Sequence, residues 1–188
     1  MQPLFTIHAG EYLVGNYIEK KFGKYVNVWI PSKDTGIDLL LTNKENSKTV
    51  SIQVKFSKDF LETTMSSEFR KDLLACGWWS LNRDKIKKSD ADFWVFVQHS
   101  FKTREVKFII LKPAELLEIF MNLNRNGKTI HSYIWITDSN NPKCWETRGL
   151  KRDEKSAICN NTYSNNSREL TRYLENWKSV AEKLNFSY

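Results

Sequence analysis

The stretch that decides the fold runs from residue 36 to residue 56 and reads GIDLLLTNKENSKTVSIQVKF. Its two ends, residues 36–42 and 50–56, are short runs rich in aliphatic or β-branched side chains. Between them lies a polar segment, residues 43–48, with the composition typical of turns. Two such runs around a polar turn predict a β-hairpin.

The second strand of this hairpin has two chemically different sides. Side chains alternate along a strand, so Gln53 and Lys55 face one side while Ile52 and Val54 face the other. The hairpin brings Asp38, at the start of the first strand, opposite the polar side. We therefore expect Asp38, Gln53 and Lys55 to meet at one edge of a sheet.

A helix is predicted upstream, over residues 8–22, because apolar residues recur there at steps of three and four and Gly23 follows. Glu11 lies on the same face of this helix as Val14 and Ile18. A carboxylate on an apolar face is costly to bury unless it meets a cation, a metal or a hydrogen-bond donor. We therefore expect Glu11 to converge with the polar residues of the hairpin.

These groups together suit the hydrolysis of phosphodiester bonds. A hard cation such as Mg²⁺ prefers oxygen ligands and keeps several waters, so one or two carboxylates and carbonyl oxygens suffice to hold it. The metal polarises the phosphate and lowers the pKa of an attacking water. A nearby lysine can hold that water or stabilise the charge that develops on the phosphoryl oxygens.

The same residues resemble the active-site motif of the PD-(D/E)XK nuclease superfamily. Glu11 matches the Glu of that family's early helix, Asp38 the Asp that opens the hairpin, and Lys55 the Lys of the next strand. Gln53 stands where most members have Glu or Asp, and a Gln-x-Lys variant is found in the Mrr-like restriction branch. Residues 31–40, which lead into the first strand, are also similar to that branch.

The resemblance covers about residues 8–60 and extends loosely to residue 113. It implies a restriction endonuclease-like fold and a DNA endonuclease that depends on Mg²⁺ (or Mn²⁺), with a role in restriction or defence. It implies metal ligands in Asp38, Gln53 and the Val54 carbonyl. It also implies that the strand Lys assists the attacking water and that the helix Glu orients this water or binds the metal through it.

The rest of the pattern predicts one α/β domain in which helices flank a mixed β-sheet. The core is expected at about residues 8–124, with residues 125–188 as a C-terminal extension. Further strands are predicted over residues 25–30, 91–98, 105–111 and 129–137, and further helices over residues 68–76, 80–88 and 113–123.

The end of the chain is predicted to form a single amphipathic helix, capped by Ser167, with an apolar stripe from Leu170 to Leu184. We expect this stripe to pack on its own domain, with a homodimer as the alternative. The preceding residues 138–166 are rich in turn formers and are expected to be irregular.

The 188 residues include 29 Lys and Arg against 22 Asp and Glu, which gives a formal net charge of +7. This balance favours a polyanionic partner, and we expect DNA. Cations that follow the hairpin are candidates for phosphate contacts, with a solvated helix face as the alternative: Arg70, Lys71, Arg83, Lys85, Lys87 and Lys88. Trp78 and Trp79 lie among them and are expected in the core, with stacking on bases as the alternative.

Several other classes of protein are disfavoured by the sequence. The longest unbroken apolar run, Phe93–Val97, is far shorter than the roughly 20 residues of a membrane helix. The first residues contain no secretion signal, so we expect a cytoplasmic protein without a membrane partner. Cys76, Cys144 and Cys159 are widely spaced and form no CxxC pair, which argues against a structural zinc site.

Two other functions stay open at this point. Because Gln53 replaces an acid, the nuclease fold could be inactive and serve only to bind DNA or a protein partner. A resolvase that cuts branched DNA, such as a Holliday junction, would use the same helix Glu and hairpin and would require a dimer.

Overall fold

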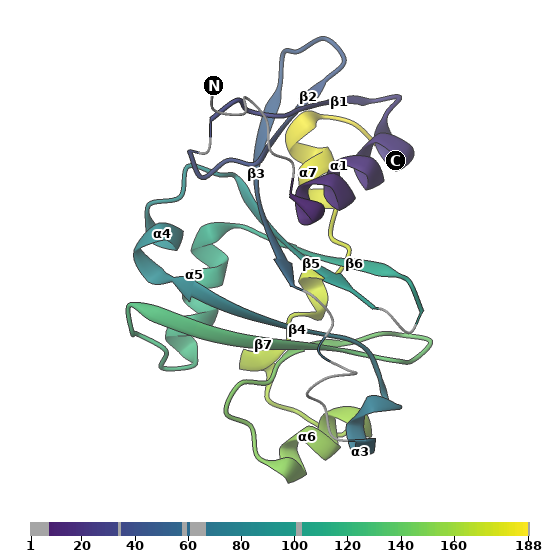
Figure 1. The fold of residues 1–188 in the computed structure, drawn as a ribbon, viewed down its shortest axis with the longest axis vertical. Helices are drawn as coiled ribbons and strands as arrows, with labels where there is room; N and C mark the ends of the chain where they lie inside the picture. Colours follow the sequence, from purple (N-terminus) through teal and green to yellow (C-terminus); the bar gives the residue numbers. More distant parts are fainter. Residues whose placement is uncertain (1–7, 34, 58–59, 61–66, 101–102, 188) are drawn as a thin grey trace.

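The computed structural model describes residues 8–33, 35–57, 60, 67–100 and 103–187 of the chain. Helices and strands are interspersed along it (Figure 1). In chain order the elements are α1 (Ala9–Phe22), β1 (Val26–Trp29), β2 (Leu39–Asn43), β3 (Thr49–Ser57), α3 (Ser67–Arg70), β4 (Leu73–Asn82), α4 (Arg83–Lys87), β5 (Phe93–His99), β6 (Val106–Leu111), α5 (Pro113–Asn122), β7 (Thr129–Thr137), β8 (Cys144–Glu146), α6 (Arg152–Cys159), two 3₁₀ turns η1 (Asn166–Arg168) and η2 (Thr171–Tyr173), and α7 (Lys178–Leu184).

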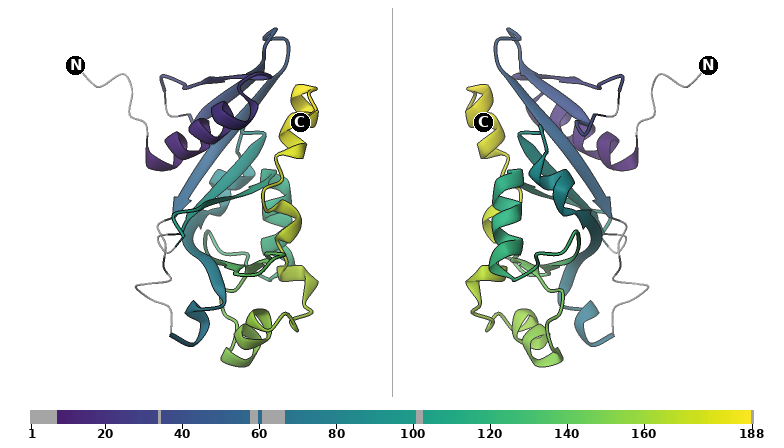
Figure 2. Two further views of the ribbon diagram at one scale, coloured as in Figure 1. Left: turned by 90° about the vertical axis from the view of Figure 1, so that its right-hand side faces the viewer. Right: turned by 90° about the vertical axis from the view of Figure 1, so that its left-hand side faces the viewer.

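The larger of two sheets has the strand order β1-β2-β3-β5-β6. β3 and β5 run parallel, whereas the other neighbours in this sheet run antiparallel. β2 and β3 form the predicted hairpin, with Leu39 opposite Ile52. Helices pack against this mixed sheet, so the expected α/β class is confirmed (Figures 1 and 2).

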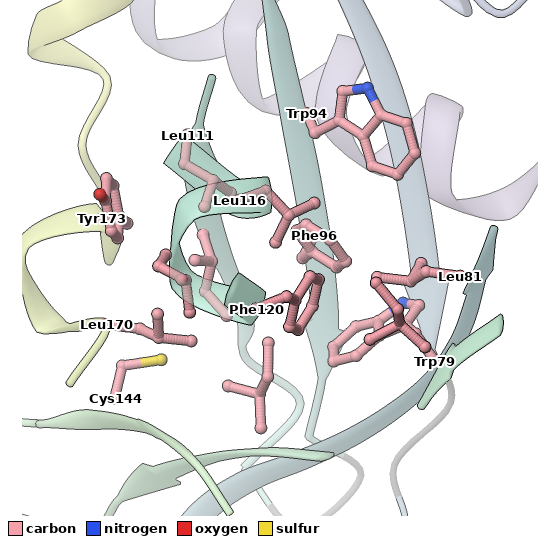
Figure 3. Close-up of a cluster of buried hydrophobic side chains, with 14 of the residues drawn as sticks. Trp79, Leu81, Trp94, Phe96, Leu111, Leu116, Phe120, Cys144, Leu170 and Tyr173 are labelled. Atoms are coloured by element: carbon pink, nitrogen blue, oxygen red, sulfur yellow. The ribbon is translucent and has the colours of Figure 1, made fainter. Parts of the chain in front are cut away.

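The two faces of this sheet meet different partners. One face packs against α1 and α7 in a buried cluster that includes Val14, Ile18, Ile52, Val54, Val180 and Leu184. The opposite face packs against α5 and the second sheet, of order β4-β7-β8, through side chains such as Trp79, Phe96 and Phe120 (Figure 3). Because Ile52 and Val54 point to α1, their neighbours Gln53 and Lys55 face the second sheet.

The prediction of a helix over residues 68–76 is wrong. The helix there is only the short α3, and β4 begins at Leu73 and pairs antiparallel with β7. Residues 73–77 are all buried, because one side of β4 faces the large sheet and the other lies under α3 and α6. A strand buried on both sides is a continuous apolar run, and such a run has no period that distinguishes it from a buried helix.

The prediction of a single helix from Ser167 onwards is also wrong. Only α7 is α-helical, and the chain before it forms the turns η1 and η2. Glu175 interrupts the helical pattern with a φ of 53°, and its N–H donates to the Phe108 carbonyl of β6 at 2.8 Å. Leu170 therefore packs on one side of the large sheet and Trp177 on the other, both almost fully buried. A stripe used inside its own chain offers no surface for a second copy.

The interval expected to be irregular contains β8 and α6. β7 and β8, from the expected C-terminal extension, form one sheet with β4, which comes from the expected core. On its outer side this sheet buries Trp135 and Trp145 under α3 and α6. None of the helices in the described part of the chain is both long and apolar enough to cross a membrane.

Candidate active site

A polar cleft of about 1170 Å³ opens where the two sheets diverge. Its walls come from the start of α1, the segment that leads into β2, the end of β3, and the junction of β4 with α4. All four residues predicted to be catalytic line it: Glu11, Asp38, Gln53 and Lys55. The structure therefore brings these four residues to the walls of one cleft.

Asp38 directly precedes β2, and both its backbone and its side chain form hydrogen bonds with β3. Its N–H donates to the Ile52 carbonyl at 2.8 Å, which continues the ladder one residue before β2. One carboxylate oxygen, Oδ2, accepts hydrogen bonds from the Val54 N–H at 2.6 Å and from the Gln53 side-chain amide. Asp38 is half-buried and lines the cleft, and both of these donors are neutral groups.

Gly36 shapes the segment before β2. Its φ of +85° lies in the left-handed region that favours glycine. A Cβ built on Gly36 would have the Gln53 Oε1 as its nearest neighbour, at 3.7 Å. The amide nitrogen of Gln53 therefore contacts Asp38, while its amide oxygen is directed towards the turn at Gly36.

Glu11 reaches the cleft because α1 starts in close contact with β3. A Cβ on Gly10 would lie 2.6 Å from the Phe56 Cβ and 3.2 Å from the Val54 Cγ1, so only glycine allows this approach. The half-buried carboxylate of Glu11 accepts a hydrogen bond from the His8 N–H at 3.1 Å, which caps the helix. Glu11 thus has a structural contact as well as a position on the cleft wall.

Lys55 is half-buried on the same side of β3 as Gln53, and its ammonium lies over an aromatic ring. Its Nζ is 5.0 Å from the ring centroid of Trp94 on β5. Trp94 is almost fully buried, and its indole N–H donates to the Ser89 hydroxyl at 2.9 Å, which fixes the ring. The negative π-face of a buried indole attracts a cation, so Trp94 attracts the ammonium of Lys55 and restricts its position.

Sequence reasoning missed Trp94. It contacts Lys55 because β5 pairs parallel with β3 in a register that sets Trp94 beside Gln53. Parallel neighbours are joined by a long crossover, so no local spacing in the sequence reveals which residues become adjacent. Trp79 on β4 also reaches this site, since its indole N–H donates to the Lys55 carbonyl at 3.3 Å.

The oxygen atoms at this edge fit a hard divalent cation. Asp38 offers a carboxylate, and the amide oxygen of Gln53 would join it only after the amide turns over, because the amide nitrogen contacts Asp38 in this structure. In an extended strand the N–H and C=O of one residue point the same way, so the Val54 carbonyl points to the side on which its N–H meets Asp38. Among the described residues, no group of three or more His, Cys, Asp or Glu side chains is gathered as for a metal. Carboxylate, amide and carbonyl oxygens are ligand types that Mg²⁺ prefers, and Mg²⁺ retains several waters and so needs few protein ligands.

The predicted phosphate-contacting residues fall into three places. Lys85 and Lys88, at α4, line the cleft. Arg83 and Lys87 lie on the other side of α4, where they border a smaller pocket against α5. The remaining two, Arg70 and Lys71, precede β4, whose ten residues span roughly 30 Å. Only the residues around α4 are therefore next to the candidate active site.

The cysteines are not candidates for catalysis. Cys76 and Cys144 are buried in the core. Burial raises the pKa of Cys159 to about 11, and the carboxylates of Asp72 and Glu68 add to this effect. A thiol with such a pKa is a poor nucleophile at neutral pH.

A second polar cluster, which we call the Glu146 cluster, lies outside the cleft. Glu146 on β8 is almost fully buried and forms ion pairs with Arg125 at 2.6 Å and Arg168 at 3.1 Å. The backbone N–H groups of Tyr133 and Arg148 donate to it as well. Because its charge is neutralised by partners of the same chain, this cluster holds together β7, β8 and η1 rather than facing a ligand.

No family model, curated protein or solved structure matches this chain. The arrangement of side chains in the cleft therefore carries the functional argument.

Proposed function

We propose that this protein is a hydrolase that cleaves phosphodiester bonds in DNA, a nuclease dependent on Mg²⁺ (or Mn²⁺) with a restriction endonuclease-like fold. The observation that carries the proposal is the convergence of Asp38, Gln53, Lys55 and Glu11 on one cleft from three separate elements.

The arrangement of the elements supports the same proposal. α1, β1, β2 and β3 follow one another, and β5 then adds parallel to β3. Asp38 and Gln53 lie next to each other across the hairpin, as the resemblance to the PD-(D/E)XK superfamily requires. The Gln-x-Lys form of the motif supports the Mrr-like branch, and with it a role in restriction or defence.

In the proposed reaction each residue has a distinct task. Asp38, with the oxygen atoms of Gln53 and Val54, would hold the metal, which when bound polarises the phosphate and activates a water. Lys55 stabilises the negative charge that develops on the phosphoryl oxygens, and Trp94 keeps its ammonium in place. Glu11 orients water at the cleft wall. Lys85 and Lys88 attract the phosphates that flank the cleaved bond.

The test is cleavage of plasmid DNA with Mg²⁺ or Mn²⁺ by the wild type and by Asp38→Ala and Lys55→Ala. We expect the wild type to convert supercoiled plasmid to nicked or linear forms, and both variants to lose this activity. Lys48→Ala, an exposed lysine in the turn at the far end of the same hairpin, is the matched control and should cleave as the wild type does. Equal cleavage by all four proteins would show that the activity is a contaminant.

One observation favours a second function, a nuclease fold that only binds DNA. The amide of Gln53 already satisfies Asp38 without a metal, so the cluster is stable as a purely polar contact. Such a module should bind DNA with the same affinity with or without Mg²⁺, and Asp38→Asn should not change this affinity. Calorimetric titration of DNA into each protein separates the two functions, because a metal-dependent nuclease binds DNA more tightly when the metal is present.

A further inference from the structure

The outer face of the second sheet carries an exposed aromatic cluster, which we call the platform and which consists of Trp78, His131 and Tyr133. Trp78 on β4 is 39% exposed, and its indole stacks on the imidazole of His131 with ring centroids 5.6 Å apart and an angle of 13°. Tyr133 is the cross-strand partner of Trp78. Phe60 contacts Trp78 edge-on at 6.5 Å. The two parallel rings therefore form a short, partly exposed stack that a further flat ring could extend.

The platform continues directly into the cleft. Ser80 and Asn82 follow Trp78 along β4 at steps of two, so their side chains point to the same face as its indole. Both residues line the cleft. Two residues of a strand span roughly 7 Å, which is about the spacing of neighbouring nucleotides in an extended single strand. A ligand that occupies the cleft can therefore reach Trp78 without leaving the protein surface.

Two lysines lie at the other end of the same line. α4 begins directly after Asn82, and its Lys85 and the following Lys88 are exposed and border the cleft, together with Asp84 and Asp90. Along β4 the surface thus presents cations, then the candidate active site, then stacked aromatic rings. Cations for the backbone and aromatic faces for the bases are the combination by which proteins bind single-stranded nucleic acid.

The neighbours of the platform disfavour an apolar protein partner. Towards α4 the outward positions beside it are Ser80, Asn82 and Thr129, all polar, and Phe60 is an apolar neighbour of Trp78. An apolar helix would need aliphatic contacts on both sides of Trp78, whereas a nucleobase needs one ring face and polar groups around it.

We propose that the platform stacks an unpaired nucleobase of the substrate, so that the protein prefers DNA with a single-stranded segment beside the cleaved bond. This inference rests on the proposed function for its choice of DNA. In an intact duplex each base is covered by its neighbours, so only an unpaired or extruded base can offer its face to Trp78. The preference for a duplex with an unpaired extension over a blunt duplex should be roughly 5- to 150-fold in affinity, the value of one stacked base.

The test is fluorescence anisotropy with two labelled oligonucleotide duplexes of the same sequence, one blunt and one with an unpaired extension, in the absence of divalent cations. We expect the wild type to prefer the extended duplex, Trp78→Leu to lose this preference, and Trp78→Phe to keep most of it. Trp29→Leu is the matched control, because Trp29 is 50% exposed on β1, in a different sheet, and should bind as the wild type does. Melting curves check that each variant is folded.

Two outcomes would overturn the inference: no preference in the wild type, or the same preference in Trp78→Leu. A third outcome would also overturn the inference. If light scattering shows that the wild type is a dimer and Trp78→Leu a monomer, the platform is a contact between two copies of the chain. Cleavage of the blunt duplex with Mg²⁺ separates this test from the proposed function. If the blunt duplex is cleaved and Trp78→Leu binds both duplexes as the wild type does, the proposed nuclease function is supported and the role of the platform is rejected. If the preference depends on Trp78 but no DNA is cleaved, the role of the platform is supported and the nuclease function is rejected.

Discussion

The Asp38 site and the Glu146 cluster both hold a carboxylate in a network of hydrogen bonds, and they differ in what neutralises the charge. Glu146 is almost fully buried and meets two arginines and two backbone N–H groups. Asp38 is half-buried and accepts hydrogen bonds from the neutral donors of Gln53 and Val54. The first network is complete within the chain, whereas the second leaves negative charge directed at a cleft.

This difference separates a group that stabilises the fold from one that is available for a ligand. A buried charge without its partners is costly, so a change in the Glu146 cluster should affect stability. A carboxylate beside solvent contributes little to the stability of the fold. A substitution in the cleft should therefore change activity rather than stability. Four predictions test or refine this contrast.

The largest effect is expected from Glu146→Ala. It leaves two guanidinium groups without their buried partner, which should lower the free energy of unfolding by about 3–5 kcal/mol and the Tm by about 10 °C. Urea unfolding followed by circular dichroism measures this loss. Glu105→Ala, which removes an exposed ion pair with Lys107, should cost less than about 1 kcal/mol. If both variants lose the same stability, the contrast between the two clusters is wrong.

Lys55→Met should leave the fold and the binding of metal and DNA intact while it slows cleavage by at least about 100-fold. The methionine keeps an apolar stem against Trp94 but removes the charge that stabilises the transition state. Lys85→Met, on the α4 wall of the cleft, should instead weaken DNA binding and lower its salt dependence by about one ion. Single-turnover cleavage and DNA titrations at several salt concentrations distinguish the two effects. A Lys55→Met protein that cleaves as fast as the wild type would falsify the catalytic role of Lys55.

Gly10→Ala and Gly15→Ala form a matched pair on α1. The first places a methyl group 2.6 Å from the Phe56 Cβ, so it should push the start of α1 away from β3, cost about 1–3 kcal/mol and displace Glu11 from the cleft. The second meets only the Val28 Cγ1 at 3.8 Å, so it should stabilise the helix by about 0.5–1 kcal/mol. Thermal melting gives the sign of each change, and cleavage rates should fall only in Gly10→Ala. Two changes of the same sign would contradict the close approach of α1 to β3.

The smallest effect is expected from Glu175→Gln. Burial raises the pKa of Glu175, against the lowering effects of the Phe108 N–H and the charge of Lys107. A raised carboxyl pKa means that stability is highest while the group is protonated and falls as pH rises through the folded-state pKa. The amide can still accept from the Phe108 N–H and carries no charge, so the variant should melt slightly higher than the wild type at about pH 7 and at the same temperature at about pH 4. A wild type that melts higher than the variant at about pH 7 but at the same temperature at about pH 4 would show that the charge of Glu175 is favourable.

Three elements of the chain are predictable because they are local. The helix that ends at Gly23, the hairpin and the helix that starts at Pro113 all agree with their expected positions. Each has a distinct period or a terminal signal that depends only on neighbours in sequence. The positions of Asp38 and Gln53 follow from the same local geometry, since a hairpin sets its own register.

The rest of the site depends on contacts between distant segments. Trp94 beneath Lys55 and Ser80 on the cleft wall come from strands that join β3 only after the chain has folded. The Glu146 cluster combines Arg125, β8 and Arg168 from an interval that has no regular pattern in the sequence. None of these neighbours has a fixed spacing from the motif residues.

The sequence by itself determined the period of each amphipathic element, and with it the hairpin that presents Asp38, Gln53 and Lys55 on one side. Only the tertiary structure decided that β4 is a strand and that the C-terminal segment bends around β6 at Glu175. The physical reason is that an amphipathic period records which side of an element is buried, but not what buries it. β4 is buried on both sides, and the segment after Leu170 changes from one face of the sheet to the other. In such segments the period no longer indicates the backbone conformation, which long-range packing decides instead.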